Sequence, residues 1–275
     1  MYSKAEVTNF IQTYGALILS IYAIVQVWAI ALWKRFIWKG KVVIFETGWI
    51  EVGFGGAGPL ITLTGTLRAQ RQDVFVQEVL LHLTRESDSN TFSLEWIAFK
   101  APQIKIGDPT ATTLELPSGI NVRVDQPMRY SIVFCDKKLQ SQINRKFSPI
   151  ANEWKQFLFQ RREKIQRAAR NPNTTEDAIA EQYLAEFMKT SEITQAALKF
   201  QEGTNWLQSG IYQIKMEVKA SSPDKTFSEE WMFSLDQELS DGLRANSLAT
   251  LKELCLGKLE YFTASLEYIK KENLR

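Results

Sequence analysis

The feature that most restricts how this chain can fold is a long stretch without charge near its N-terminus. No Asp, Glu, Lys or Arg side chain occurs between Glu6 and Lys34, and residues 14–33 read YGALILSIYAIVQVWAIALW. Twenty helical residues rise about 30 Å, which is the thickness of the hydrocarbon core of a bilayer. The stretch therefore predicts a single transmembrane helix, marked by Tyr14, Leu17, Ile21, Ile24, Gln26, Trp28 and Trp33.

Two other interpretations fit these residues less well. A buried helix of a soluble protein usually carries a polar stripe, whereas Ser20 and Gln26 are the only strongly polar residues here. A cleaved signal peptide has cations before its apolar run and small residues at the cleavage site, but bulky and basic residues follow Trp33 in this chain. We therefore expect the helix to be retained in the membrane.

The cations that flank the stretch predict its orientation. Lys4 precedes it, and the basic flank that follows it consists of Lys34, Arg35, Lys39 and Lys41. Because an excess of positive charge stays on the cytoplasmic side, residues 42–275 are expected in the cytoplasm and the short N-terminus outside. Two widely separated cysteines agree with a reducing compartment.

A period of two dominates the chain from residue 42 to about residue 134. Ile61, Leu63 and Leu67, for example, are separated by threonines and by Gly65. Such alternation is typical of strands with one buried face, and turn sequences such as Pro117-Ser118-Gly119 separate the segments. Six to eight short strands at this spacing predict a mainly-β soluble domain, an immunoglobulin-like sandwich.

The rest of the chain is predicted to add helices to this sandwich. Residues 137–205 show helical spacing, with Ser148-Pro149 as the expected start of one helix, and residues 206–239 return to strand alternation. Residues 240–275 read as one amphipathic C-terminal helix, because Leu251, Cys255 and Leu259 follow one another at helical spacing. We therefore expect residues 1–41 as tail, span and flank, residues 42–136 and 206–239 as the sandwich, residues 137–205 as a helical insertion, and residues 240–275 as the terminal helix.

Composition excludes several kinds of site. With two cysteines, one histidine, and 33 basic against 31 acidic residues, the chain cannot form a zinc finger, an iron–sulfur site or a disulfide-rich scaffold. The glycines of residues 53–58 precede a strand and not a helix, and nothing near His82 in the sequence orients it as a base. We therefore predict no catalytic residue, no cofactor and no metal site.

The segment 137–170 carries ten basic residues and two acidic ones. Cations on a helix with aromatic residues on its other side suit an anionic lipid surface, and a solvated polar face that balances the acidic C-terminal half is the alternative. No base-stacking motif accompanies the charge, which makes a nucleic-acid partner unlikely on sequence grounds. The residues predicted for this contact are Lys155, Arg161, Arg162, Lys164, Arg167 and Arg170.

Together these features predict a non-catalytic, single-pass membrane protein that binds lipid through its span and acts as a scaffold or assembly component. Its partner would be another protein or a second copy. One alternative is a lipid- or hydrophobic-ligand-binding protein or enzyme at the membrane surface. Another is an envelope-assembly protein whose domain lies outside the cytoplasm.

Overall fold

The computed structural model describes residues 4–36, 40–55, 58–100, 114–170 and 175–270. The helices are α1 (Lys4–Phe36), α2 (Lys137–Gln160), α3 (Arg162–Ala169), α4 (Glu176–Thr190), α5 (Glu192–Thr204) and α6 (Gln237–Leu256). The strands are β1 (Lys41–Gly55), β2 (Gly58–Gln70), β3 (Val74–Arg85), β4 (Thr91–Lys100), β5 (Leu114–Glu115), β6 (Ile120–Val122), β7 (Met128–Cys135), β8 (Gly210–Ser222), β9 (Asp224–Leu235), β10 (Ala264–Glu267) and β11 (Ile269–Lys270).

The strands form one antiparallel sheet in the order β10-β1-β2-β7-β4-β3-β8-β9-β11, with β5 on β4 and β6 on β3. The prediction of a mainly-β domain with helices is therefore confirmed. The strands of this sandwich-like fold belong to one hydrogen-bonded path, to which β5 and β6 attach through β4 and β3.

The segment from Ala264 to Lys270 joins the two ends of this path. Its first half pairs with β1, where Ile50 faces Leu266, and its second half pairs with β9, where Met232 faces Ile269. Between the halves, the N–H of Tyr268 donates to the carbonyl of Gly48 at 2.9 Å. The sheet is therefore nearly closed, and one short segment satisfies backbone groups on both of its edges.

This pairing corrects the prediction of one helix over residues 240–275. Helix α6 ends at Leu256, and Gly257 follows in the left-handed conformation (φ 70°), with its N–H bonded to the carbonyl of Glu253. Glycine adopts this conformation without the steric cost that a Cβ brings, so it terminates helices efficiently. Beyond it, the buried side chains of Ala264, Leu266 and Tyr268 alternate with exposed ones, as expected of a strand.

The core fills the inside of the sheet. The inward apolar side chains from Ile61 to Ala69 on β2 and those of β3 are at most 1% exposed, and those of β8 are at most 3% exposed. Each fully buried Leu, Ile or Val contributes about 1.5–3 kcal/mol relative to an exposed position, so this layer is a main source of stability. The residues concerned include Ile61, Leu63, Leu67, Val79, Leu81, Leu83, Ile214, Met216 and Val218.

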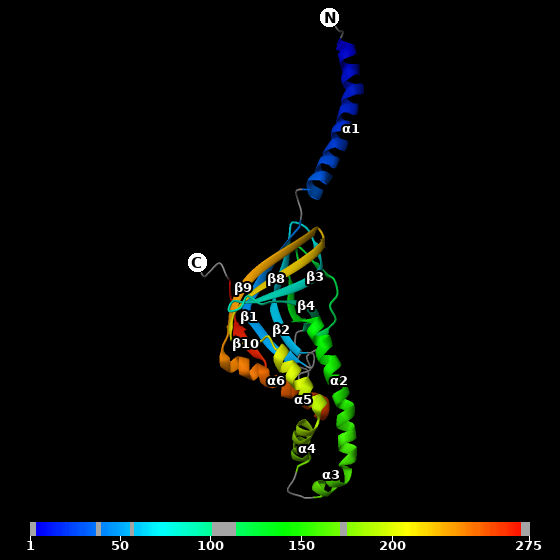
Figure 1. The fold of residues 1–275 in the computed structure, drawn as a ribbon. Coiled ribbons are helices and arrows are strands. Elements are labelled where there is room, and N and C mark those ends of the chain that lie inside the picture. The colour runs from blue at the N-terminus through cyan, green and yellow to red at the C-terminus, as the bar shows by residue number, and fades with distance from the viewer. Residues whose placement is uncertain (1–3, 37–39, 56–57, 101–113, 171–174, 271–275) are drawn as a thin grey trace.

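Helices α2 to α5 lie between β7 and β8 in the chain, and α2 extends away from the sheet (Figure 1). The predicted helix start at Ser148-Pro149 is wrong: α2 begins at Lys137 and runs through Pro149. Asp136 caps it, since its carboxylate accepts from the N–H groups of Lys138 and Leu139 at 2.9 and 3.0 Å. Thr175 and Ser191 cap α4 and α5, since their hydroxyl groups accept from the N–H groups of Ala178 and Thr194.

Helix α1 projects from the end of the sheet at which β1 begins (Figure 1). Within the described part of the chain, no helix combines the length and the hydropathy that crossing a membrane requires.

We predict that replacing Tyr268 with alanine loosens both edges of the sheet. The Tyr268 ring packs on Trp231 at 5.5 Å between centroids, and removing a buried aromatic costs about 3–5 kcal/mol. Amide hydrogen exchange should therefore accelerate at residues 49–52 of β1 and also at residues 231–232 of β9. Phe159→Ala, at a residue that is 76% exposed, is the control, and acceleration at only one edge contradicts the closure.

Candidate functional site

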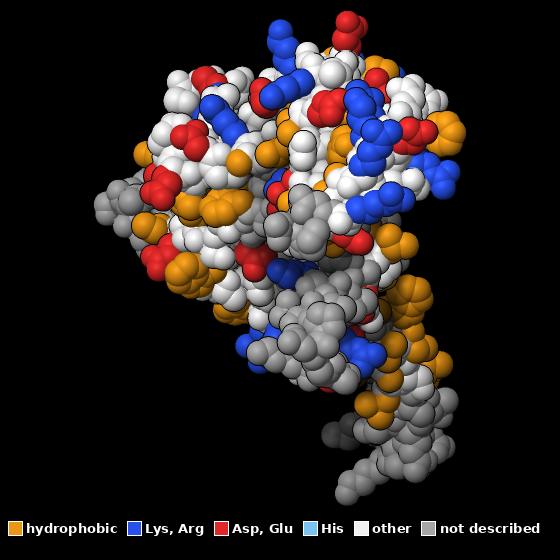
Figure 2. All heavy atoms as spheres, turned by 90° about the horizontal axis from the view of Figure 1, so that it is seen from below, with side chains coloured by type: hydrophobic (Ala, Val, Ile, Leu, Met, Phe, Trp, Pro, Cys, Tyr) orange, Lys and Arg blue, Asp and Glu red, His pale blue; other side chains and the backbone are white. Residues whose placement is uncertain are grey.

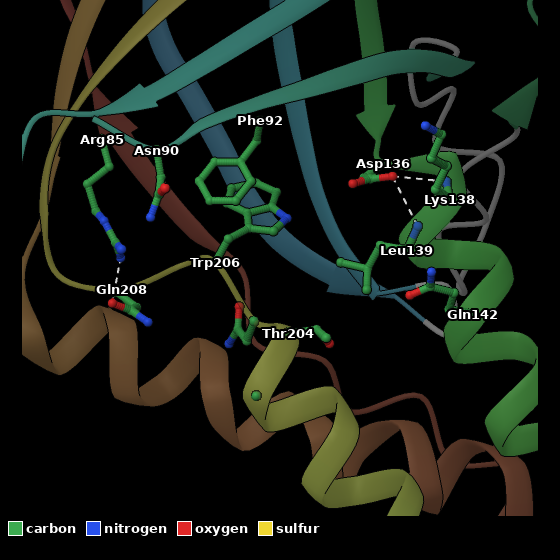
Figure 3. A pocket seen from close by; sticks show the side chains of 12 residues that line it. Arg85, Asn90, Phe92, Asp136, Lys138, Leu139, Gln142, Thr204, Trp206 and Gln208 are labelled. Carbon is green, nitrogen blue, oxygen red and sulfur yellow. Dashed lines mark hydrogen bonds between the residues drawn. The ribbon is translucent and has the colours of Figure 1, made fainter. Parts of the chain in front are cut away.

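The candidate binding site is a pocket between the sheet and the helical segment, which we call the α2–α5 pocket (Figure 3). Its volume is about 390 Å³. The wall consists of the β3–β4 turn, the start of α2, and the connection from α5 to β8. The residues used below are Arg85, Phe92, Asp136, Lys138, Trp206 and Gln208.

A buried arginine fixes one side of the pocket. Arg85 is 8% exposed; it forms a two-point ion pair with Asp88, and its Nη1 donates to Oε1 of Gln208 at 2.5 Å. The guanidinium lowers the pKa of Asp88 to about 2, and the Asp88 carboxylate raises the pKa of Arg85. Because both charges are already matched, Arg85 orders the wall and does not present an unbalanced charge to a ligand.

The connection behind the pocket is held by Tyr212. Its hydroxyl lies 3.0 Å from the carbonyl oxygen of Trp206 and 2.6 Å from that of Gln208, and it accepts from the Gln208 N–H at 3.0 Å. Burial raises the pKa of this phenol. Oδ1 of Asn205 accepts from the N–H of Leu207 at 3.0 Å, so the backbone around Trp206 is fixed from both sides.

Trp206 supplies the one buried side-chain donor of this pocket that has no partner within the described chain. Its ring is 5% exposed and stacks on Phe92 at 5.3 Å between centroids, and its Nε1 makes no hydrogen bond. Figure 3 shows the nitrogen-bearing edge turned toward the start of α2. A buried donor left unpaired costs about 1–3 kcal/mol, so an acceptor brought to this edge would recover that free energy.

The pocket has the groups of a binding site and lacks those of a reaction centre. Aromatic rings, amides and the exposed Lys138 can contact a ligand, whereas the carboxylate of Asp136 is engaged in capping α2. Nothing among its lining residues pairs a nucleophile with a base.

We predict that Trp206→Phe costs less stability than Trp154→Phe. Both indoles are 5% exposed, and both substitutions remove a similar part of the ring. Trp154 Nε1, however, donates to the carbonyl of Cys255 at 2.8 Å, so its loss removes a hydrogen bond and leaves that carbonyl unpaired. Chemical denaturation should show a difference of about 1–2 kcal/mol in the free energy of unfolding. Equal costs would mean that the Trp206 N–H is satisfied in the folded protein.

The sequence did not predict a cluster of Ser93, His82 and Glu217, because only the pairing of their strands brings these residues together. Oγ of Ser93 on β4 lies 3.1 Å from Nδ1 of His82 on β3, and Nε2 of His82 lies 3.5 Å from the carboxylate of Glu217 on β8. The pairing register, which places His82 opposite Ser93, is not readable from local sequence. These are the residue types of a nucleophile, a base and an orienting acid.

This group lacks two properties of a hydrolase site. Lys215 also binds Glu217, at 2.7 Å, and its bond is the main reason that the pKa of Glu217 lies below the usual range. His82 lies on β3, whose backbone is paired with β4 and with β8, so the N–H groups that would stabilise an oxyanion are engaged in the sheet.

The cysteines are weak candidates for chemistry. Burial raises the pKa of the Cys135 thiol to about 11 and that of Cys255 to about 12, so neither is a thiolate at neutral pH. No cluster of three potential metal ligands occurs in the described part of the chain.

The residues predicted to lie in the membrane all belong to α1. Six of them are large apolar residues that are between 50% and 66% exposed, and Gln26 is also exposed. Figure 2 shows the described side chains of α1 as a hydrophobic stretch projecting from a surface of mixed charge. Of the predicted flank, Lys41 is exposed at the start of β1, whereas Lys39 and the side chains of Lys34 and Arg35 lie outside the described residues.

The predicted basic contact residues gather at the far end of α2 and on α3, but they are not equivalent. Arg161 lies over the ring of Phe157 at 3.7 Å and pairs with Glu186 at 2.8 Å, so it serves the packing of α2 on α4. Arg167 pairs with Glu163 at 3.4 Å within α3. The other four are exposed and have no acidic partner among the described residues: Lys155, Arg162, Lys164 and Arg170.

Comparisons with known proteins do not extend these observations. A scan against protein-family models finds no match, and neither the curated proteins nor the solved structures give one.

Proposed function

We propose that the protein is a non-catalytic, single-pass membrane protein that presents its β-rich domain and helical extension to a protein partner. Helix α1 would lie in lipid, and residues 42–275 would lie in the cytoplasm. The observation that carries the proposal is the exposure of α1: its described large apolar side chains from Tyr14 to Trp33 are between 48% and 69% exposed.

The free energy of insertion supports a lipid environment. Residues 14–33 contain nine Leu, Ile and Val residues, each worth roughly −0.3 to −0.6 kcal/mol on the insertion scale, or about −3 to −5 kcal/mol together. The side chains of Ala16 and Ile18, within this stretch, lie outside the described residues. The proposal therefore rests on the sequence of the whole stretch together with the exposure of its described part.

The distribution of these side chains favours lipid over a partner helix as their cover. Ile21, Tyr22, Val27 and Ile30 are each at least 48% exposed, and at about 100° per residue they point to different sides of the helix. A single partner helix covers one stripe, whereas lipid covers the whole circumference.

We predict that the full chain stays in the membrane pellet after extraction with alkaline carbonate. Ile21→Arg combined with Val25→Arg should release it, because each arginine costs about 2.5–3.5 kcal/mol near the centre of a span and together they outweigh the favourable term. The matched control places two arginines on exposed apolar residues of the domain, Ile211→Arg with Ile269→Arg, and should stay in the pellet. Release of the unmodified chain rejects the anchor.

The orientation is tested by labelling from outside. We predict that an impermeant maleimide modifies Glu163→Cys only after cells are permeabilised, because Glu163 is highly exposed on α3 and would be cytoplasmic. Ser3→Cys, before the span, should react in intact cells. Cys135 is buried and the pKa of Cys255 is raised, so both native thiols react slowly. The opposite labelling pattern favours the extracytoplasmic alternative.

Binding of a small ligand is the second candidate function, favoured by the unpaired Trp206 donor in the α2–α5 pocket. It ranks below the first because side chains fill the inside of the sheet and the α2–α5 pocket is modest in size and of mixed polarity. A lipid chain would require a longer apolar cavity.

A further inference from the structure

The far end of α2 and the adjoining α3 form a surface that the fold itself does not use. Four of its side chains are exposed cations without an acidic partner in the described chain, and we call them, together with Phe159, the distal basic surface: Lys155, Phe159, Arg162, Lys164 and Arg170. Glu163 is the single acidic residue within the stretch 155–170.

Phe159 is the most unusual member. It is 76% exposed, although its neighbours Trp154 and Phe157 are buried and pack on Phe187 at 5.2 Å between centroids. Lys155 lies one turn before Phe159 on the same face of α2. A large exposed aromatic beside cations is the composition of a binding surface, because aromatic and arginine residues contribute most of the binding free energy at protein interfaces.

Three acidic residues of α4 already form ion pairs with other groups of the chain. Glu186 pairs with Arg161, and Asp177 and Glu181 both pair with Lys258. These three carboxylates of α4 therefore do not neutralise the distal basic surface, whereas Glu176 lines a pocket with Ala169 of α3 and has no ion pair among the described residues.

The position of this surface determines which partner fits it. Helix α1 lies at the end of the sheet where β1 begins, and α2 extends from the sheet toward the opposite end of the molecule (Figure 1). The 24 residues of α2 add about 36 Å to that separation. The surface therefore faces away from the membrane in which α1 would lie, and contact with that same membrane, as expected from sequence, does not fit this arrangement.

We infer that the distal basic surface binds an acidic segment of a partner protein that carries an apolar side chain. The inference deepens the proposed function, on which it rests for the location of the membrane. Arginine forks bind carboxylates through paired hydrogen bonds, and Phe159, one turn after Lys155 on α2, offers an exposed apolar contact. Binding through this surface weakens with salt, because its charges are exposed.

The test measures binding of a fluorescent peptide with repeated Glu-Glu-Leu-Glu sequence to the full chain in an uncharged detergent. Anisotropy is read at about 50 mM and about 200 mM salt, where screening of exposed charges differs strongly. Arg162→Gln, Lys164→Gln and Arg170→Gln combined should weaken binding about tenfold at the lower salt concentration. A matched triple variant, Arg68→Gln, Arg123→Gln and Lys225→Gln, removes the same charge from exposed residues elsewhere and should change binding less than about twofold.

A second comparison distinguishes binding at the distal basic surface from a general effect of net charge. Phe159→Ala keeps the net charge and should weaken binding about fivefold, whereas Leu116→Ala, at a residue that is 84% exposed, should leave it unchanged. Equal losses in the two triple variants overturn the inference, as does an unchanged affinity in Phe159→Ala.

Vesicles containing anionic phospholipid provide the last arm. One outcome is that the full chain binds these vesicles more strongly than it binds the peptide, and that the first triple variant loses this binding. That outcome assigns the surface to a second membrane and overturns the protein-partner inference. Carbonate extraction reports on the anchor independently of both measurements, so failure of the anchor and failure of this inference are distinguishable.

Discussion

The pairing of residues 264–270 with both β1 and β9 is the constraint on which the rest of the domain depends. A sheet with two open edges leaves two rows of backbone N–H and carbonyl groups unpaired, and such edges invite aggregation. Here one segment satisfies part of both rows and places Tyr268 against Trp231. Closure keeps the inner faces of β2, β3 and β8 together, and these faces hold the fully buried core.

The closed sheet also supports the helices. Asp136, directly after β7, caps the start of α2. Residues 205–209 lead the chain back to β8, and the hydroxyl of Tyr212 holds this connection by a hydrogen bond to the carbonyl of Trp206. The α2–α5 pocket lies between these two connections, and the far end of α2 carries the distal basic surface. The two candidate surfaces are therefore at opposite ends of one helix, which is anchored in the sheet at the pocket end.

Local sequence predicted the alternating strands well, because inward residues such as Ile61 and Leu63 are apolar and their neighbours are not. The predicted helix boundaries were wrong where a single glycine or proline determined or misrepresented the end of a helix. Leu259 and Leu266 continue the helical spacing past Gly257, and only the left-handed cap shows that the spacing is coincidental there. Pro149 predicted a helix start where there is none. It lies inside α2, whose tertiary packing tolerates a proline.

The candidate sites were less predictable than the strands. The cations of the distal basic surface are visible in the sequence, but their distance from the N-terminal helix is not. The Ser93–His82–Glu217 contacts depend on the register of three strands, and the unpaired Trp206 donor depends on packing. Long-range geometry determines each of these contacts, whereas composition alone predicts which kinds of site to exclude.

Closure by residues 264–270 has a consequence for biosynthesis. A ribosome translates this segment after every other strand of the sheet and long after the apolar helix at the start of the chain. Until it emerges, the nascent domain has both edges open and its slow, long-range pairings incomplete. The sheet can therefore reach its nearly closed form only after all of its other strands have been synthesised.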